Sequence, residues 1–336
     1  MIVGIFNNKG GVGKTTYLYH LAHMLARGGA TVLMVDGDPQ CNLTAYALAD
    51  AHIVRSWAPE RGNSLYLALE PLHEEMGDIR DRRPLRPNPE SYPNLWLVPG
   101  DPKLSEFEDT LGDSWTRAKG GRAADVRKQT GFFRYIKSAS QKIEADIVLV
   151  DLGPNLGPLN RTALTSCDYF IVPVAPDLFS IRGTQNLGSK LVLWRREWDQ
   201  IRGANNDGAI EMPNGAPKFL GYVRQQHNSR NTETGMTKGW AIFGKDMEQA
   251  IVANIAKKLE PLDQVILWKD GSYDLGSIPN LHSLVPYSQN SRKPIFDCGS
   301  RDGVTGAHLA KAANTTKLFE HMTETLFKLR NSHPHT

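Results

Sequence analysis

The sequence predicts an α/β protein with a doubly wound, mainly parallel β-sheet flanked by helices. Short apolar runs that fit buried strands alternate with stretches in which apolar residues recur at helical spacing. A glycine-rich loop separates the first apolar run from the first helical stretch, and two apolar runs end in aspartate. Strands that alternate with helices form parallel sheets, because each crossover helix returns the chain to the same edge of the sheet.

The expected strands are short and apolar, and they cover residues 2–6, 31–35, 95–98, 147–150, 169–174 and 219–223. The expected helices carry apolar side chains on one face: one with Leu18, Leu21 and Leu25, one at 104–111, one with Phe132, Ile136, Ala139 and Ile143, and one at 247–259. Thr130 fits the N-cap of the third helix. Gly28 or Gly29 can end the first helix in the left-handed conformation.

We expect a single domain over residues 1–330, with a tail at 331–336, because the informative motifs are spread along one alternating pattern. Within it, the segment 51–130 is predicted to be longer and loop-rich. The expected loops are rich in Pro, Gly, Asn or basic residues: 80–87, 117–128 and 201–216.

Composition and charge exclude several classes of protein. Of the 336 residues 40% are hydrophobic, and the net charge is only +3, so any DNA contact must come from a local basic patch. Cys41, Cys167 and Cys298 form no C-x-x-C pair, which argues against a disulfide framework or a zinc site. No apolar run approaches the ~20 residues of a membrane span, and the first run continues directly into the glycine-rich loop, so we expect a cytoplasmic protein.

Residues 9–16, KGGVGKTT, predict a phosphate-binding loop between a strand and a helix. Glycines let the backbone turn tightly and point its N–H groups at an anion, and the helix N-terminus adds to the attraction. Lys14 is expected to contact the β- and γ-phosphates, and Thr15 the Mg²⁺ ion. The predicted nucleotide-binding residues of the loop are Gly10, Gly11, Val12, Gly13, Lys14, Thr15 and Thr16.

Three aspartates, Asp36, Asp38 and Asp151, follow two of the expected strands. Ligands of open parallel sheets lie beyond the carboxyl ends of the strands, so we expect these carboxylates to converge on the phosphates. Asp151 ends an apolar strand in the Walker B manner, and its carboxylate can hold Mg²⁺ directly or through water. The alternative for Asp36 and Asp38 is that they only start the turn before Pro39.

The loop departs from the usual G-x-x-x-x-G-K-[ST] pattern, because Asn8 stands where the first glycine would be. The form K-G-G-V-G-K-T-T resembles the deviant Walker A loop of the ParA/MinD family of ATPases. In that family the early lysine reaches into the other subunit of an ATP-sandwich dimer, and Lys9 is the matching residue. The resemblance therefore implies ATP and Mg²⁺ as ligands and a homodimer that forms on ATP binding.

The segment D-G-D-P-Q-C-N-L-T at 36–44 resembles the D-x-D-P-Q-x-N-x-T segment of the ParA branch. By this resemblance Asp38 positions or activates the attacking water, while Asp36 shapes the site. D-L-G-P-N-L-G at 151–157 resembles the D-x-P-P-S-L-G switch, with Gly153 in place of a proline and Asn155 in place of a serine. The implied catalytic residues are Lys9, Lys14, Asp38 and Asp151, and the implied metal-site residues are Thr15, Asp38 and Asp151.

Three further segments match the family less specifically. P-V-A-P-D at 173–177, followed by Gly183, resembles P-V-x-P-E. V-P-Y-S at 285–288 resembles the segment that borders the adenine, which points to Pro286. Gln226, His227 and Asn228 follow a strand at the place where a residue that reads the base often lies.

The resemblance implies a slow ATP-driven switch that a protein partner stimulates, used in plasmid or chromosome partition or in positioning another cargo. Nonspecific DNA binding by the ATP-bound dimer would come from the helix after Gly183, where Lys190, Arg195 and Arg196 lie close together. These three residues also fit an ordinary solvated helix face.

Two alternatives differ in the surface or partner used. A MinD-like ATPase would bind a membrane through the apolar stripe of Leu318, Met322, Leu326 and Leu329. Interior packing of this stripe is the expectation, because Glu320 and Glu324 interrupt the basic polar face that membrane helices carry. The other alternative is a ParA-like ATPase whose segment 51–130 serves a specialised partner, in a defence or secretion operon.

Overall fold

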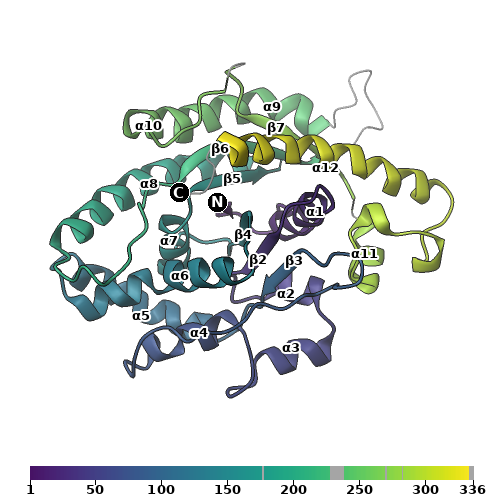
Figure 1. Cartoon of the computed structure of the whole chain (residues 1–336). Coiled ribbons are helices and arrows are strands. Elements are labelled where there is room, and N and C mark those ends of the chain that lie inside the picture. Colours follow the sequence, from purple (N-terminus) through teal and green to yellow (C-terminus); the bar gives the residue numbers. More distant parts are fainter. Residues whose placement is uncertain (176–177, 228–237, 269–270, 282, 333–336) are drawn as a thin grey trace.

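A computed structural model shows a central β-sheet with helices packed on both faces (Figure 1). It describes residues 1–175, 178–227, 238–268, 271–281 and 283–332, and leaves undescribed the side chains at 178–181, 226–227, 238–243 and 332. In these residues the sheet has seven strands, all parallel, in the order β3-β2-β4-β1-β5-β6-β7. The strands are β1 (Ile2–Ile5), β2 (Val32–Asp36), β3 (Leu95–Val98), β4 (Ile147–Asp151), β5 (Tyr169–Val174), β6 (Lys218–His227) and β7 (Asp274–Pro279).

Helices connect the strands and cover both faces of the sheet (Figure 1). They are α1 (Lys14–Arg27), α2 (Asn42–Ala47), α3 (Asp50–Ser56), α4 (Leu65–His73), α5 (Leu104–Ala118), α6 (Ala123–Lys142), α7 (Pro158–Thr165), α8 (Leu178–Ala204), α9 (Lys238–Ile251), α10 (Lys257–Leu259), α11 (Val285–Ser291) and α12 (Ala307–Ser332). A π-helical turn, Val252–Ala256, joins α9 to α10.

Alternate side chains of each strand enter two separate cores, because successive residues of a strand point to opposite faces of the sheet. In β2, Leu33 and Val35 pack in the core shared with α4 to α9. Val32 and Met34 pack in the core shared with α1, α2 and α12. Burial on both faces explains why the strands read as continuous apolar runs rather than alternating ones.

The strand order brings the acidic strand ends to the glycine-rich loop. Strand β4 lies between β2 and β1, and Asp36 pairs in register with Asp151. The loop follows β1 directly, so it lies beside the end of β4. The sheet thus positions the loop and both carboxylates at one edge, as the sequence predicts.

The α/β class, the parallel sheet and all six predicted strands are confirmed. β6 runs on to His227, past its predicted end. The edge strand β7 is missing from the prediction. Asp274, Gly276 and Ser277 interrupt any apolar pattern, and the strand pairs only with β6. Gly29, with a φ of 90°, is the left-handed residue after α1.

Two expectations in the segment 51–130 are wrong. Residues 117–128 are not a loop, because α5 and α6 cover them except for the turn at 119–122. Thr130 is not an N-cap but lies inside α6, where its hydroxyl donates to the carbonyl oxygen of Val126 (2.9 Å). The segment is therefore richer in helices than the sequence suggests, although residues 80–87 do lack helix.

A third, smaller core explains why these helices form. It joins α5, α6, α8 and the loop after α8 through Trp115, Ala118, Val126, Trp198, Ile201 and Ile210. The rings of Trp115 and Trp198 stack with centroids 5.7 Å apart. Contacts between segments so far apart in sequence favour helix here over the turn that the local Gly, Arg and Lys content indicates.

Three of the four residues of the apolar stripe of α12 are packed inside the protein, as expected, whereas Leu318 is only partly buried. Met322, Leu326 and Leu329 are buried in the core beneath α1, and the Phe319 ring stacks on that of Tyr17 with centroids 6.4 Å apart. Among the residues that the structure describes, no helix combines the length and apolarity needed to cross a bilayer.

Candidate phosphate and metal site

The glycine-rich loop has the backbone geometry that phosphate binding requires. Gly11 and Gly13 have φ values of 72° and 82°, in the left-handed region that favours glycine. Gly13 is also the N-cap of α1, so no side-chain oxygen caps this helix, and its first turn holds no acidic residue. The first amides of α1 therefore keep their attraction for an anion.

The two lysines of the loop differ in environment. Lys14 is 7% exposed, and its ammonium donates to the carbonyl oxygen of Lys9 (3.1 Å). Burial lowers the pKa of Lys14, while the charges of Asp151 and Asp38 oppose that shift. Lys9 is only partly buried, and its backbone N–H donates to Asn7 Oδ1 (2.9 Å). Lys14 thus lies within the acidic site, whereas Lys9 lies at its rim.

Thr15 and Asp151 meet where a metal ion would be held. The Thr15 hydroxyl donates to Asp151 Oδ2 at 2.7 Å, joining the loop to the end of β4. The other carboxylate oxygen of Asp151 is buried without a hydrogen-bond partner. Burial raises the pKa of Asp151 to about 8, and the neighbouring charge of Asp36 adds to the shift. A buried carboxylate with an unused oxygen next to a threonine hydroxyl fits the oxygen ligands that Mg²⁺ prefers.

Asp36 has a structural position behind the site. Its Oδ2 accepts from both the N–H (2.8 Å) and the hydroxyl (2.6 Å) of Thr44. The Gly100 N–H in turn donates to the Thr44 hydroxyl (2.7 Å), and a Cβ at Gly100 would lie 2.8 Å from the Asp36 carboxyl carbon. Burial raises the pKa of Asp36 to about 6. Asp36 therefore ties β2 to α2 and to the end of β3.

Asp38 lies at the same edge of the sheet and is buried, with an exposure of 7%. Its Oδ1 accepts from the Gln40 N–H (3.0 Å). The backbone of Gly153 packs against it, since a Cβ there would lie 3.3 Å from Asp38 Oδ1. The glycine that departs from the family proline thus gives the Asp38 carboxylate its room.

The switch segment 151–157 is held by an amide network. Asn160, in the first turn of α7, is 2% exposed. Its Nδ2 donates to the carbonyl oxygens of Gly153 (3.0 Å) and Asn155 (2.8 Å). Asn155 Oδ1 accepts from Asn160 Nδ2 and from the Gly157 N–H, both at 2.8 Å. Asn155, the second departure from the family pattern, therefore closes the turn with its own amide.

The sequence prediction missed several residues beside the loop. Buried Asn7 donates through Nδ2 to the Pro173 carbonyl oxygen (2.6 Å), which links β1 to the end of β5. Gln225, at the end of β6, faces the loop, because a Cβ at Gly13 would lie 3.1 Å from its Oε1. An isolated Asn or Gln carries no spacing signal, so only the sheet order could identify them.

The remaining candidates are less well placed. Pro286 is in the first turn of α11, which is tied to α2 by a hydrogen bond from the Tyr46 hydroxyl to the Ser288 hydroxyl (2.9 Å). The side chains of Gln226 and His227, and all of Asn228 and Asp177, lie outside the described residues. Among those described, no three His, Cys, Asp or Glu side chains form a metal cluster.

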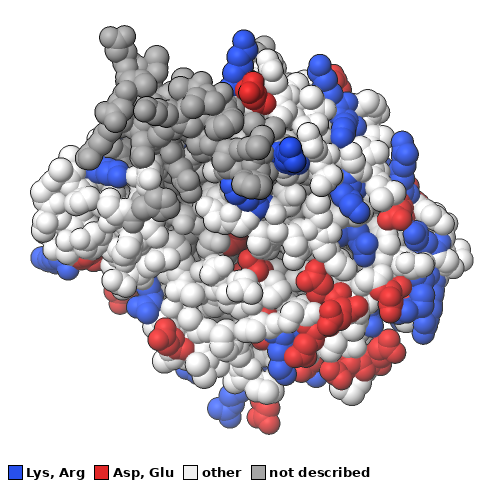
Figure 2. Space-filling model, turned by 180° about the vertical axis from the view of Figure 1, so that it is seen from behind, with Lys and Arg blue, Asp and Glu red and all other residues white. Residues whose placement is uncertain are grey.

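The three candidate DNA contacts do not share a face of α8. At 100° per residue, each pair of Lys190, Arg195 and Arg196 is separated by at least about 100° around the helix axis. Arg195 is engaged within the protein: Nη1 donates to the Asn214 carbonyl oxygen (2.6 Å) and Nε pairs with Asp199 (3.1 Å). Lys190 and Arg196 are exposed. Figure 2 shows basic side chains along one edge of the molecule, with acidic side chains gathered nearby.

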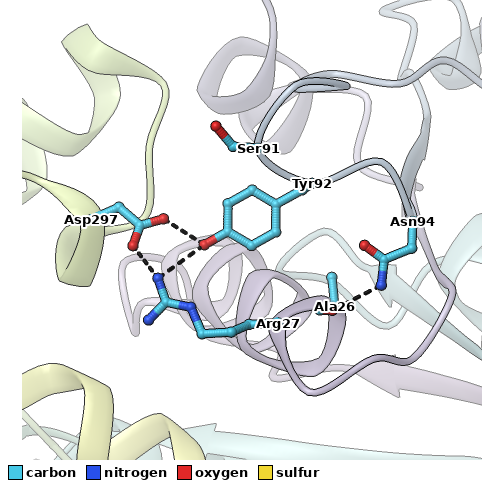
Figure 3. A pocket seen from close by; sticks show the side chains of 6 residues that line it. All are labelled: Ala26, Arg27, Ser91, Tyr92, Asn94 and Asp297. Atoms are coloured by element: carbon cyan, nitrogen blue, oxygen red, sulfur yellow. Dashed lines mark hydrogen bonds and ion pairs between the residues drawn. The ribbon is translucent and has the colours of Figure 1, made fainter.

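A separate pocket of 340 Å³ lies at the opposite end of α1. Arg27 and the Tyr92 hydroxyl both bind the carboxylate of Asp297 there, and Asn94 binds the Ala26 carbonyl oxygen (Figure 3). These polar groups satisfy one another and join α1 to the segments before β3 and after α11. The residues that line the pocket hold these segments together, and they lie far from the phosphate loop.

The parallel sheet and the glycine loop that begins α1 are typical of P-loop nucleotide-binding proteins. Comparison with known proteins narrows this class. Residues 1–200 match a family model described as an AAA domain. A putative replication protein A from Rhizobium rhizogenes is 32% identical over 182 residues, which cover 54% of this chain and 41% of that protein. The chromosome partitioning protein ParA of Caulobacter vibrioides is 30% identical over 208 residues, covering 61% and 64%.

Solved structures extend the likeness beyond the matched sequence. A protein from Corynebacterium diphtheriae superimposes with a TM-score of 0.67 at 27% identity, covering 87% of this chain and 96% of that one. The ATP complex of a Cyanothece McdA variant superimposes with a TM-score of 0.57 at 18% identity, covering 97% and 95%, which shows the shared fold. The chain belongs to the ParA/Soj family of P-loop ATPases. It spans 41% and 64% of the lengths of the two curated relatives above.

Proposed function

We propose that this protein binds MgATP, forms a dimer with the nucleotides at the interface and hydrolyses ATP as a slow switch. The observation that carries the proposal is the meeting of Thr15 with Asp151, whose second carboxylate oxygen is buried without a partner. Membership of a P-loop ATPase family supports the nucleotide. The ATP bound to the related McdA fold supports the same ligand class.

Each group at the site has a definite part in this proposal. The backbone amides of the loop and the Lys14 ammonium bind the phosphates, while Thr15 and Asp151 hold Mg²⁺. When bound, the metal neutralises negative charge on the phosphate oxygens. Asp38, whose charge acts on Lys14, orients the water that attacks the γ-phosphorus. In this structure the Lys14 ammonium donates to the carbonyl oxygen of Lys9. Nucleotide binding replaces that hydrogen bond with contacts to phosphate.

The proposed dimer uses Lys9, at the rim, to contact the nucleotide of the second subunit. Its partly exposed position suits such a contact better than the buried position of Lys14. Hydrolysis then removes the phosphate that both subunits hold, and the dimer separates. A protein partner that favours the reactive arrangement would set the timing, as expected for a weak intrinsic ATPase.

We further propose that the switch acts in DNA partition or in positioning of a cargo. Curated relatives named as chromosome partitioning protein and replication protein support this use. Nonspecific DNA binding by the dimer is part of the proposal, with Lys190 and Arg196 the exposed candidates on α8. The MinD-like alternative loses its main argument, because the α12 stripe is buried in the protein core.

Light scattering with and without MgATP tests the core of the proposal, with the Lys14→Ala variant as the control. We expect the wild type to shift from monomer to dimer with MgATP but not with MgADP, and Lys14→Ala to stay monomeric. Calorimetry should show severe loss of ATP affinity in Lys14→Ala at unchanged thermal stability. If the wild-type protein binds no ATP, the proposed nucleotide ligand is wrong. If it binds ATP without dimerising, the proposed dimer switch is wrong.

A further inference from the structure

The N-terminus of α7 lacks a cap of its own. Its N-cap residue is Gly157, which offers no side-chain oxygen, and Pro158 has no backbone N–H. Leu159 therefore carries the first N–H of the helix that needs an acceptor. That N–H donates to Glu108 Oε1 at 3.3 Å, so a side chain from α5 supplies the missing cap.

Glu108 is half-buried in this position and fits closely against the backbone of Gly157. A Cβ at Gly157 would lie 2.2 Å from Glu108 Oε1 and 2.8 Å from Asn155 Oδ1, so the glycine leaves room for the carboxylate. Burial raises the pKa of Glu108, the Leu159 N–H opposes that shift, and the charges of Asp109 and Asp38 add to it. The carboxylate of Glu108 thus lies within electrostatic range of Asp38.

The capped turn leads directly to the water-orienting residue. Asn160 follows Leu159 in the same turn, and its amide holds the carbonyl oxygen of Gly153 at 3.0 Å. The Gly153 backbone packs against the Asp38 carboxylate. A displacement of the first turn of α7 would therefore pass through Asn160 and Gly153 to the space in which Asp38 acts.

We propose that Glu108 is a positioning residue, through which α5 of the segment 51–130 fixes the switch 151–157 and so the Asp38 carboxylate. This inference rests on the proposed ATPase function and assigns a role to that segment. Glu108 acts on the N-terminus of α7 in this arrangement, so its loss should affect turnover rather than ATP binding.

The test compares Glu108→Ala, Glu108→Gln and Gly157→Ala in steady-state ATP hydrolysis. Glu108→Ala should lower kcat about tenfold with the KM for ATP within about twofold of wild type, since small misplacements of catalytic groups are costly. Glu108→Gln keeps an acceptor oxygen and should restore most of kcat. Gly157→Ala should lower kcat at least as much as Glu108→Ala, because the added methyl would displace both the end of Glu108 and the Asn155 amide oxygen that closes the switch.

Two controls separate positioning from stability. Asp109→Ala removes a neighbouring exposed carboxylate of α5 and should leave kcat unchanged. Ser64→Ala removes the N-cap of α4, where the Ser64 hydroxyl accepts from the Leu67 N–H, and should lower stability without the selective loss of kcat. An unchanged kcat in Glu108→Ala, or an equal loss in Ser64→Ala, would overturn the inference.

Hydrogen exchange in the nucleotide-free protein provides a readout that does not depend on ATPase activity. Glu108→Ala should accelerate exchange in the peptide that covers residues 153–163, and Glu108→Gln should largely restore protection. If exchange there is unchanged, Glu108 does not hold the switch. A wild type that hydrolyses no ATP but shows the expected exchange pattern would refute the proposed function and the catalytic role, while the cap itself would stand.

Discussion

The Thr15 hydroxyl and the Asp151 carboxylate form a 2.7 Å hydrogen bond between the phosphate loop and the end of β4. The pKa of Asp151 is raised to about 8 by burial, so without a cation its ionised form is disfavoured. A buried carboxylate whose ionised form is disfavoured in the free protein, but which a bound metal ion would stabilise, is typical of a binding site.

Asp151→Asn should therefore separate stability from metal dependence. We expect the nucleotide-free variant to be at least as thermally stable as wild type, because it removes a buried group whose ionised form is disfavoured by burial. Its ATP affinity should no longer rise when Mg²⁺ is added, whereas the wild type should gain about tenfold or more. Calorimetric titration of ATP with and without Mg²⁺ measures this, and an unchanged Mg²⁺ effect would remove Asp151 from the metal site.

Lys9→Ala should bind ATP with nearly wild-type affinity yet fail to dimerise. Lys9 lies at the rim of the loop, so its proposed contact is with the nucleotide of the other subunit. Fluorescent nucleotide binding and light scattering on the same sample measure the two properties separately. An ATP-induced dimer of normal stability in Lys9→Ala would show that this lysine contributes only to its own subunit.

Asp38→Ala should bind ATP and dimerise but turn over at least about a hundredfold more slowly, because water is no longer oriented while the phosphate cradle is intact. Its stability should change little, since the Asp38 side chain accepts only the local Gln40 N–H among the hydrogen bonds described. Single-turnover hydrolysis is the measurement. Normal turnover would move the water-orienting role to another residue, and Asp151 would be tested next.

Lys190→Glu combined with Arg196→Glu should weaken binding of the ATP-bound dimer to random-sequence DNA by about tenfold or more and reduce its salt dependence. Both side chains are exposed, so dimerisation should persist. Arg195→Glu is a less selective variant, because it also breaks the contact with Asn214. If the ATP-bound wild type binds no DNA at low salt, the partition proposal fails and a specialised partner becomes the better explanation.

His20 should make the free energy of unfolding depend on pH. The Ile295 N–H donates to His20 Nε2 (2.9 Å), so Nδ1 carries the proton that reaches the Thr16 carbonyl oxygen (2.7 Å). Burial lowers the pKa of His20 to about 3. Between its unfolded pKa of about 6.5 and that value, the unfolded chain binds a proton that the folded protein does not, so stability falls as pH falls.

His20→Asn should therefore flatten the pH dependence between pH 6 and 4 by up to about 1.4 kcal/mol per pH unit relative to wild type. Denaturant unfolding at several pH values measures the difference. His321→Asn serves as the matched control, because the side chain of His321 is 72% exposed and should leave the slope unchanged. Equal slopes for His20→Asn and wild type would show that His20 is protonated in the folded state.

Local sequence determined the phosphate loop, the six predicted strands and Asp151 as a strand-end carboxylate, because each depends on contiguous residue types. Gly11 and Gly13 adopt the conformation for which glycine is needed, and the apolar runs form strands buried on both faces. Local composition gave a wrong prediction where long-range packing determines the secondary structure. Residues 117–128 look like a loop but are held as helices by a tryptophan core to which α8 and the loop after it contribute half of the buried residues.

Only the tertiary structure decided which distant groups meet. The strand order sets Asp151 against Thr15, and it brings Asn160 and Gly153 to Asp38. Glu108 caps a helix that begins fifty residues later, and no periodicity in its own helix indicates this. Such contacts depend on crossover connections and register, which are properties of the whole sheet, whereas a motif records only what neighbouring residues can do.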